Sequence, residues 1–332
     1  MKKLEIKEPS SICYQFMAFP LMVMECNSKS YEWIYGNFIQ TCFDTAYHKA
    51  PVPFYFYIFD YTISPFLEVH KINRDFLNFN KIKILDLVKN SINNNYYIYL
   101  NLDEFYVPQR FSYKVKHFSH DCLIHGYDLE KKEIYLFGYS SKWQIESTSI
   151  SFDEFELAYM NLELIDTELT YINLYRCKES GQYALKLDMI VKQLIEYLEG
   201  INSSEQFSML KEPFERAYGM NFYQYIGEYL LNCETYNIEY DIRVFHFLFE
   251  HKKIMENRIR YLLETSRIKD EALLNDWEGI AEDALVIKNK VMKLQVLRKY
   301  DYQDLNNRIQ ILGKNERKVL IETIYHLESL ID

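Results

Sequence analysis

The pattern of apolar and polar positions changes character near residue 165. Before that point, short runs rich in aromatic and β-branched residues predict strands, and after it apolar positions recur at helical spacing almost without a break. The predicted strands lie at 52–69, 96–101, 120–128 and 133–139, and the polar LEKK between the last two predicts a β-hairpin. We therefore expect an α+β fold, with an N-terminal domain over residues 1–170 and an all-helical domain over 171–332 that covers its cleft.

Helices are also predicted within the N-terminal half. Residues 13–26 form an apolar run with Pro20 inside it, and a kink is expected there because proline lacks the N–H that a helix interior uses. Residues 151–163 open with Ser-x-x-Glu, the pattern of a capping box. The helical half holds six further candidates, at 183–199, 205–217, 221–232, 240–264, 271–297 and 302–329, the last interrupted around Gly313.

Composition narrows the class of protein. A net charge of −10 argues against a general nucleic-acid binder, and the chain has neither a GxxxxGK[ST] nor a GxGxxG phosphate loop. No apolar run is long enough to span a membrane, so no membrane partner is expected. The six cysteines have no short repeated spacing and are typical of free thiols in a reducing compartment, which makes the cytoplasm the expected location. The aromatic-rich helical half offers surface for a homodimer.

Cys13 is the first candidate for chemistry. Ser10 and Ser11 precede a helical run and can provide its N-cap, which would place the Cys13 sulfur in the first turn. There the helix dipole favours a thiolate, and unpaired amides can stabilise an oxyanion. A buried structural thiol is the alternative, and Cys26 is a rival nucleophile that we expect instead to close the preceding helix.

His120, at the head of a predicted strand, is the base that a cysteine nucleophile requires. His117 and His125 compete for this role. His117 and His120 also have HxxH spacing, but three residues along a strand place two side chains on opposite faces, and no further ligand at suitable spacing completes a set. We therefore expect no bound metal.

The order of these residues resembles a known family. Besides Cys13 and His120, the resemblance rests on SYEWIYGNF (30–38), LNLDEFYVPQR (100–110), HxxLxxGYD (120–128) and YDIRVFHFLFEHKKIMENRIRYL (240–262). The family is that of butirosin-biosynthesis protein H, whose members have a papain-like cysteine-peptidase fold and occur in antibiotic and nonribosomal-peptide-type pathways, as in closthioamide assembly.

The resemblance implies an amide-forming acyltransferase. A cysteine takes an acyl group from the phosphopantetheine thioester of an acyl or peptidyl carrier protein, and a small amine then attacks the acyl-enzyme. Carried onto this chain, Cys13 is the nucleophile and His120 the base. No tightly bound cofactor is implied, since the pantetheine arm belongs to the carrier protein.

One position departs from the family pattern. Peptidase-like members carry an Asp or Asn after the histidine strand, whereas Gly138 and Tyr139 stand here, so the local pattern indicates a dyad unless a remote residue supplies the third group. Two alternatives follow: a cysteine peptidase or hydrolase using the same dyad, and a catalytically degenerate binding or scaffold homologue.

Segment 241–269 is locally basic in an acidic chain, with seven Lys and Arg against four Asp and Glu. Carrier proteins are acidic, so Arg243, Lys252 and Lys253 are expected to bind the carrier protein or its phosphate. A solvated helix face with pairs such as Glu256–Arg260 is the alternative.

Overall fold

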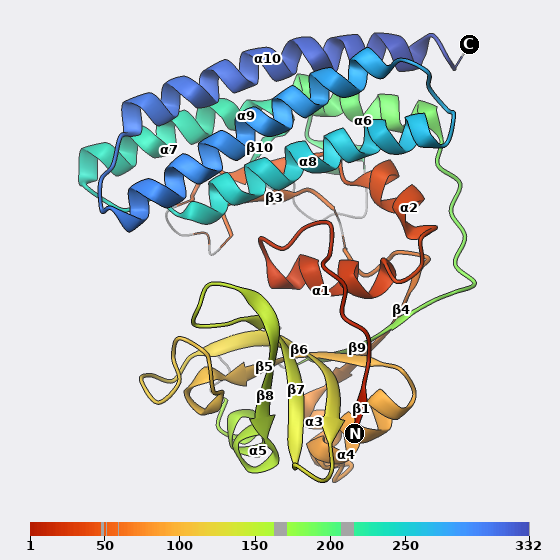
Figure 1. The fold of residues 1–332 in the computed structure, drawn as a ribbon, viewed down its shortest axis with the longest axis vertical. Helices are drawn as coiled ribbons and strands as arrows, with labels where there is room; N and C mark the ends of the chain where they lie inside the picture. The colour runs from red at the N-terminus through yellow and green to blue at the C-terminus, as the bar shows by residue number, and fades with distance from the viewer. Residues whose placement is uncertain (48–49, 51, 59, 163–170, 207–215, 332) are drawn as a thin grey trace. The chain divides into compact units, whose positions relative to one another are not determined.

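The computed structural model describes residues 1–47, 50, 52–58, 60–162, 171–206 and 216–331 (Figure 1). The chain forms two compact units, one of residues 1–30 and 60–183 and the other of residues 31–59 and 184–332. This organisation differs from a single boundary at residue 170. Strand β9 (Tyr171–Cys177) pairs with strands of the first unit, and residues 31–59 belong with the helical unit.

The first unit is built on a seven-stranded antiparallel sheet with the order β4-β9-β5-β6-β7-β8, and β1 pairs with β6. The strands are β1 (Lys2–Lys3), β4 (Leu67–Asn73), β5 (Tyr97–Asp103), β6 (Ser119–Asp128), β7 (Glu133–Tyr139) and β8 (Ile145–Ser151), besides β9. β6 and β7 form the predicted hairpin, with Asp128 opposite Glu133. β5 confirms the strand predicted at 96–101.

Helices cover both faces of this sheet (Figure 1). Helices α3 (Arg74–Phe79), α4 (Ile84–Asn93) and α5 (Phe152–Met160) enclose the core on one face, around side chains such as Ile98 and Ile124. Successive strand residues face opposite ways, so Tyr99 points to the other face. There helix α1 (Gln15–Met24) packs, with the Phe19 ring 5.5 Å from Tyr99 and 6.2 Å from Phe137.

Helix α1 confirms the helix predicted within 13–26 and contains Pro20, but it begins at Gln15 with Tyr14 as N-cap. The expected capping by Ser10 or Ser11 is therefore wrong. The backbone N–H of Ser10 donates instead to Glu25 Oε1, at 3.0 Å.

Helix α5 starts where the capping box predicts, because Ser151 Oγ accepts the Glu154 amide at 3.3 Å. Residue 163, the last of this predicted helix, lies outside the described residues.

The second unit combines helices with a small antiparallel sheet of order β10-β2-β3. Its strands are β2 (Thr41–Asp44), β3 (Phe54–Phe56) and β10 (Arg216–Tyr218). Its helices are α2 (Ser30–Asn37), α6 (Leu187–Glu199), α7 (Phe222–Tyr236), α8 (Ile242–Glu264), α9 (Glu271–Val296) and α10 (Tyr302–Glu328), with short 3₁₀ turns η3 (Ser203–Gln206) and η4 (Gly219–Asn221).

Five of the six predicted C-terminal helices correspond to α6 through α10. The sixth, at 205–217, lies mainly outside the described residues, and its last two positions form part of β10. The apolar run at 52–69 is not one strand: it contributes β3 to the second unit and the beginning of β4 to the first.

Helix α10 runs without a break through Gly313, so the expected interruption is wrong. A Cβ placed on Gly313 would lie 2.9 Å from Cγ of the Tyr223 ring. The glycine therefore allows α7 and α10 to pack closely, where a larger residue would push the Tyr223 ring away.

A buried ion pair joins α8 to α10. Lys252 and Glu316 are both fully buried, with Lys252 Nζ 2.7 Å from Glu316 Oε1. The hydroxyls of Tyr197 and Tyr223 donate to the two carboxylate oxygens at 3.0 and 2.6 Å. Lys252 Nζ also lies 3.1 Å from His251 Nδ1, so both charges have hydrogen-bond partners as well as each other.

The substitution Glu316→Gln is expected to lower the free energy of unfolding by about 3–5 kcal/mol, because it leaves the Lys252 charge buried without an anion. Lys252→Met/Glu316→Gln removes both charges and should cost clearly less, because no charge is left buried alone; the amide oxygen accepts one tyrosine hydroxyl and the amide nitrogen can donate to the other. Urea denaturation followed by circular dichroism measures both. Equal losses in the two variants would contradict the importance of charge pairing.

Candidate active site

The side chain of Gln15 fixes the start of α1 to the ends of two strands. Gln15 Oε1 accepts the backbone N–H of Tyr139 in β7 at 2.6 Å. Gln15 Nε2 donates to the carbonyl and to Oδ1 of Asp121 in β6, at 2.9 and 2.7 Å. Both ends of the Gln15 amide are therefore used to hold the chain in position.

Cys13 lies within this anchored segment. Gln15 follows Cys13 by two residues. Ile12 directly precedes Cys13, and its carbonyl accepts the Tyr139 hydroxyl at 2.9 Å. Cys13 is 5% exposed and precedes the N-cap of α1 instead of lying in the first turn. The Tyr14 side chain makes no capping hydrogen bond, and the Tyr14 carbonyl accepts the Met17 and Ala18 amides at 3.1 and 2.9 Å.

His120 lies at the same edge of the sheet, next to Asp121 in β6. Its Nδ1 is 2.7 Å from Oε1 of Glu104, which is buried and opens the 3₁₀ turn η1 (Glu104–Tyr106) after β5. Its Nε2 is 3.6 Å from Asp121 Oδ1, the oxygen that also binds Gln15. An ionised carboxylate accepts hydrogen bonds and cannot donate one. The bond to Glu104 therefore keeps the imidazole proton on Nδ1 and leaves Nε2 as the basic nitrogen.

Glu104 places a carboxylate on the imidazole, where the sequence pattern at Gly138 and Tyr139 predicts a dyad without one. β5 and β6 pair so that Leu102 lies opposite His120, and the turn after Asp103 brings Glu104 back toward the imidazole. The Glu104 amide donates to the Phe118 carbonyl at 2.9 Å, which fixes this approach. The available signal was the acidic pair in LNLDEFYVPQR, although it does not say which of the two acids meets His120.

The electrostatic surroundings stabilise protonated His120. Burial of the ring lowers its pKa, but the hydrogen bond to Glu104 and the negative charges of Asp121 and Glu104 outweigh burial, so the pKa is raised above 6.5. An imidazole with this bias accepts a thiol proton readily and then pairs with the thiolate.

The two competing histidines have other partners. His117 Nδ1 is 2.6 Å from Asp103 Oδ2, and its ring stacks on Phe105 with centroids 4.5 Å apart. His125 is buried against Leu4 and Ser147, and burial lowers its pKa to about 4. Of the three, His120 is the one whose neighbour Asp121 bonds to the segment of Cys13.

Gln15 fills the space at Gly138, the position at which the resemblance leads us to expect an orienting Asp or Asn. Gly138 has φ +157°, and a Cβ there would lie 2.6 Å from Gln15 Oε1 and 3.3 Å from Nη2 of buried Arg110. Arg110 donates to the Gly138 and Tyr139 carbonyls at 3.2 and 2.5 Å. No side chain fits at Gly138 without displacing these anchors.

Cys26 has a less favourable setting for a nucleophile. It follows the C-cap of α1, where the helix dipole disfavours an anion, and its Sγ donates to the Met22 carbonyl at 3.6 Å. Burial raises the pKa of the Cys26 thiol, although the charge of Lys7 opposes this. A thiolate is therefore disfavoured at Cys26.

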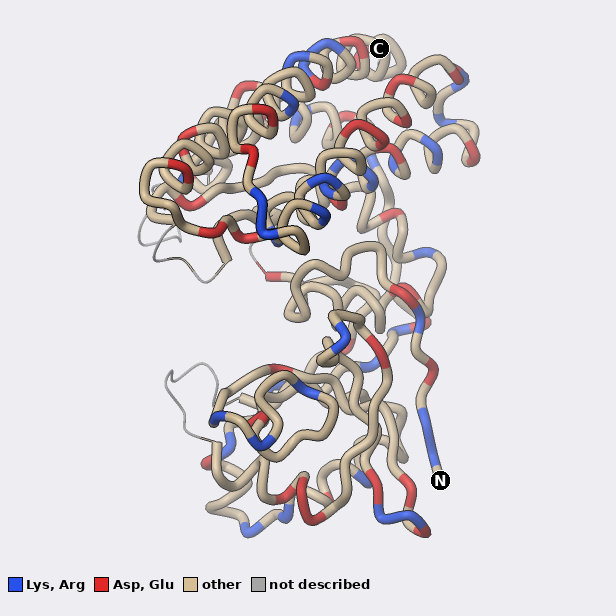
Figure 2. The backbone as a smooth tube through the Cα atoms, turned by 60° about the vertical axis from the view of Figure 1, so that its left-hand side comes forward, with Lys and Arg blue, Asp and Glu red and all other residues tan. Residues whose placement is uncertain are grey.

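The three basic residues expected to bind a carrier protein all lie on α8 but have different surroundings. Lys252 is fully buried against Glu316, so the expectation of direct contact with a carrier protein is wrong for it. Lys253 is half exposed and pairs with Glu256 at 2.7 Å, and Arg243 pairs with Asp241 at 2.6 Å. Figure 2 shows acidic and basic residues interspersed along the long helices, as in a solvated face with local ion pairs.

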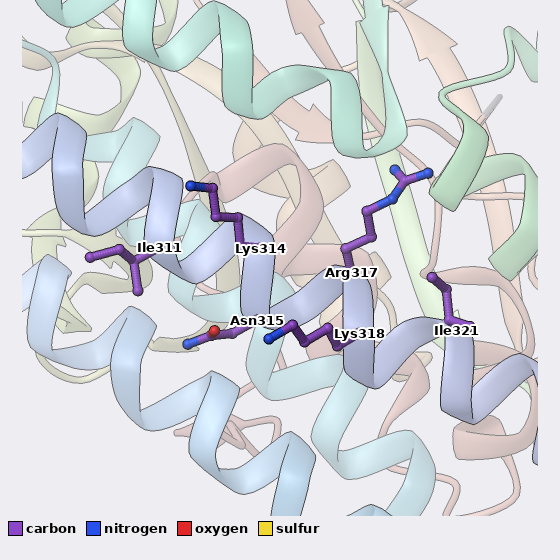
Figure 3. A pocket seen from close by; sticks show the side chains of 6 residues that line it. All are labelled: Ile311, Lys314, Asn315, Arg317, Lys318 and Ile321. Carbon is purple, nitrogen blue, oxygen red and sulfur yellow. The ribbon is translucent and has the colours of Figure 1, made fainter.

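A shallow hollow on the surface of α10 lies in the other unit from Cys13 and His120 (Figure 3). Six residues of that single helix line it: Ile311, Lys314, Asn315, Arg317, Lys318 and Ile321. It is not part of the candidate active site.

Comparison with known proteins adds no family assignment: no protein-family model matches the chain, and no curated protein matches it. Within the described ranges, no three His, Cys, Asp or Glu side chains are grouped to hold a metal ion. Among the same residues, none of the helices has both the length and the apolar character needed to cross a bilayer.

We expect Glu104→Gln to lower the pKa of His120, because the substitution removes the anion that stabilises the imidazolium. Proton NMR of the imidazole C–H resonances measures the midpoint, with His120→Gln identifying the signal among the eight histidines.

Asp103→Asn is the matched control, since Asp103 bonds His117 and not His120. It should leave the His120 midpoint unchanged. A Glu104→Gln midpoint equal to that of wild type would show that Glu104 does not act on His120.

Proposed function

We propose that this protein is a cysteine-dependent acyltransferase with a papain-like first unit, which forms an amide from a carrier-protein thioester and a small amine in natural-product biosynthesis. The observation that carries the proposal is the Glu104–His120 hydrogen bond beside the anchored segment of Cys13. The proposal is also supported by the antiparallel sheet, because its histidine strand β6 is hydrogen-bonded to the start of α1, the helix that directly follows the Cys13 segment.

Glu104 favours a working enzyme over a degenerate homologue. A degenerate site has no need to keep a buried carboxylate on the histidine, since burial of an acid is costly without a partner. With Glu104 on Nδ1, the three groups have the roles of a nucleophile, a base and an orienting acid, as in other cysteine and serine acyl-transfer sites.

The acylation step follows from these roles. His120 Nε2 accepts the proton of the Cys13 thiol, and Sγ attacks the thioester carbonyl of the acyl carrier. In this proposal, backbone amides near Cys13 at the start of α1 bind the oxygen that becomes negative. The C–S bond to pantetheine then breaks, and His120 returns its proton to the leaving thiolate, which leaves an acyl-Cys13 thioester.

The second step consumes the amine. The amine attacks the acyl-Cys13 carbonyl and gives a proton to His120 Nε2, and the C–S bond to Cys13 breaks to release the amide. The Cys13 thiolate remains paired with the imidazolium. Water competes with the amine for the same thioester, so amide formation requires an amine held close to the carbonyl in a site that limits water.

The test is the mass of the intact protein after incubation with an acyl-pantetheine thioester. Wild type is expected to gain one acyl group, and an added amine should release it as an amide. Cys13→Ala should give no adduct, and His120→Ala and Glu104→Gln should slow acylation by about 10²- to 10⁴-fold.

Cys26→Ala is the matched control and should acylate like wild type. Release of the acyl group by water alone, at the same rate with and without amines, would support the hydrolase alternative. If no adduct forms and Cys13 does not react with iodoacetamide at neutral pH, the proposal of an enzyme is contradicted, and the alternative of a binding protein is supported.

A further inference from the structure

Two neighbouring loops of the first unit expose aromatic and lysine side chains together. One loop follows β5 and precedes β6, and the other joins β7 to β8. Trp143 is 74% exposed, and Phe111 and Phe118 are 44% and 45% exposed. We name as the aromatic–lysine surface the following six exposed residues: Phe111, Lys114, Lys116, Phe118, Lys142 and Trp143.

The charge of these loops is opposite to that of the whole chain. Residues 105–120 and 140–145 contain Arg110, Lys114, Lys116 and Lys142 but no Asp or Glu, although the chain has a net charge of −10. Arg110 is buried, so the three lysines present the charge to solvent. This differs from α8, where acidic and basic residues alternate and pair.

The loops are held in shape before any partner arrives. The Ser141 amide donates to the Gln109 carbonyl at 2.8 Å, which ties one loop to the other. The rings of Phe111 and Trp143 have centroids 4.3 Å apart, and Lys116 Nζ lies 5.3 Å from the Phe118 ring. A rigid aromatic pair loses little conformational freedom on binding, which is typical of residues that dominate protein interfaces.

The backbone of these loops is strained at the exposed positions. Lys114 and Trp143 have φ values of +55° and +61°, in the left-handed region that side chains other than glycine rarely adopt. Because the Trp143 side chain is mostly exposed, its hydrophobic burial contributes little to stability, so stability does not explain why a tryptophan occupies this position. Seven other non-glycine residues among those described share a positive φ, so Trp143 is distinguished by its exposed indole in addition to its backbone.

The surface adjoins the candidate active site. The Phe118 ring lies 5.5 Å from the His120 ring, and Trp143 follows Tyr139, which binds both Ile12 and Gln15, by four residues. A protein that covers Phe118 and Trp143 therefore lies beside the edge of the sheet that holds His120 and the segment of Cys13.

We propose that the aromatic–lysine surface is the docking site for an acidic partner protein, which is the acyl-carrying protein of the reaction. This identification of the partner rests on the proposed function; the acidic character of the partner rests on the three lysines. Docking brings the thioester next to His120, while Phe111 and Trp143 supply the apolar contact at the centre.

Binding is observed through Trp143. The other two tryptophans, Trp33 and Trp277, are 5% and 0% exposed, so a change in indole emission on binding reports on Trp143. The probe is an acetyl-loaded acyl carrier protein of bacterial fatty-acid synthesis, titrated at low and high salt. We expect a saturable change in emission that weakens with salt, because the attraction is between charges.

The same carrier protein and acetyl-pantetheine are compared as acyl donors to Cys13. Lys114→Glu/Lys116→Glu/Lys142→Glu and Trp143→Gly should each lower kcat/KM about tenfold or more with the carrier protein. Both variants should leave the rate with acetyl-pantetheine unchanged, since the small donor needs no docking. Trp143→Gly should not lower the midpoint of thermal unfolding, because glycine accepts the positive φ.

Lys314→Glu/Arg317→Glu/Lys318→Glu on α10 is the control with the same change of charge, and it should act like wild type with both donors. Equal losses with both donors, or no saturable emission change with the carrier protein, would overturn the docking site. An emission change with anionic phosphatidylglycerol vesicles but not with the carrier protein would assign the surface to a membrane instead. Emission changes on carrier binding without acylation from either donor would refute the acyltransferase and keep the docking site.

Discussion

The side-chain amide of Gln15 is hydrogen-bonded at both ends, and the position of Cys13 depends on those bonds. Its oxygen is used by the Tyr139 amide and its nitrogen by Asp121, so the start of α1 is attached to β7 and β6 at once. Leaving a buried polar group without its partner costs roughly 1–3 kcal/mol, and a shift of α1 along the sheet would break several such bonds together. The segment of Cys13 is therefore held in one register relative to the strand that carries His120.

The same attachment decides where the orienting acid stands. Because Gln15 and Arg110 take the space above Gly138, the end of β7 has no room for a carboxylate. The carboxylate that contacts His120 comes from the end of β5, where the chain turns through η1. Asp103 holds that turn by accepting the Phe105 and Phe118 amides, both at 3.1 Å, which frees its neighbour Glu104 to face His120. Of these two adjacent acids, Asp103 stabilises the turn and Glu104 contacts the His120 imidazole.

Local signals in the sequence were enough for elements that depend on neighbours along the chain. The β6–β7 hairpin, the Ser151 cap of α5 and the five long helices all follow from periodicity or capping over a few residues. The Glu104–His120 pair was missed because it joins residues 16 apart through the register of two strands, which no local pattern encodes. The assignment of residues 31–59 to the helical unit was missed for the same reason: β2 pairs with β10 through Cys42 opposite Tyr218, far away in sequence. The N-cap predicted at Ser10 or Ser11 was wrong because side-chain type alone does not say at which residue a helix begins, and α1 begins at Gln15.

Net charge along a helix is a poor guide to docking, because it does not distinguish cations that face solvent from cations that replace water inside the fold. Arg258 of α8 is almost fully buried and donates to the carbonyls of Tyr35 and Phe38 at 2.6 Å, at the end of α2, where helix carbonyls lack intrahelical partners. Lys252 is likewise buried in an ion pair with Glu316. The long α8 therefore uses these charges to hold its own unit together, and basic residues that a partner can reach must be sought where no acid and no carbonyl has already bound them. On the loops beside His120, Lys114, Lys116 and Lys142 are exposed and take part in none of the ion pairs found among the described residues, which is why the docking proposal uses these short irregular segments and not α8.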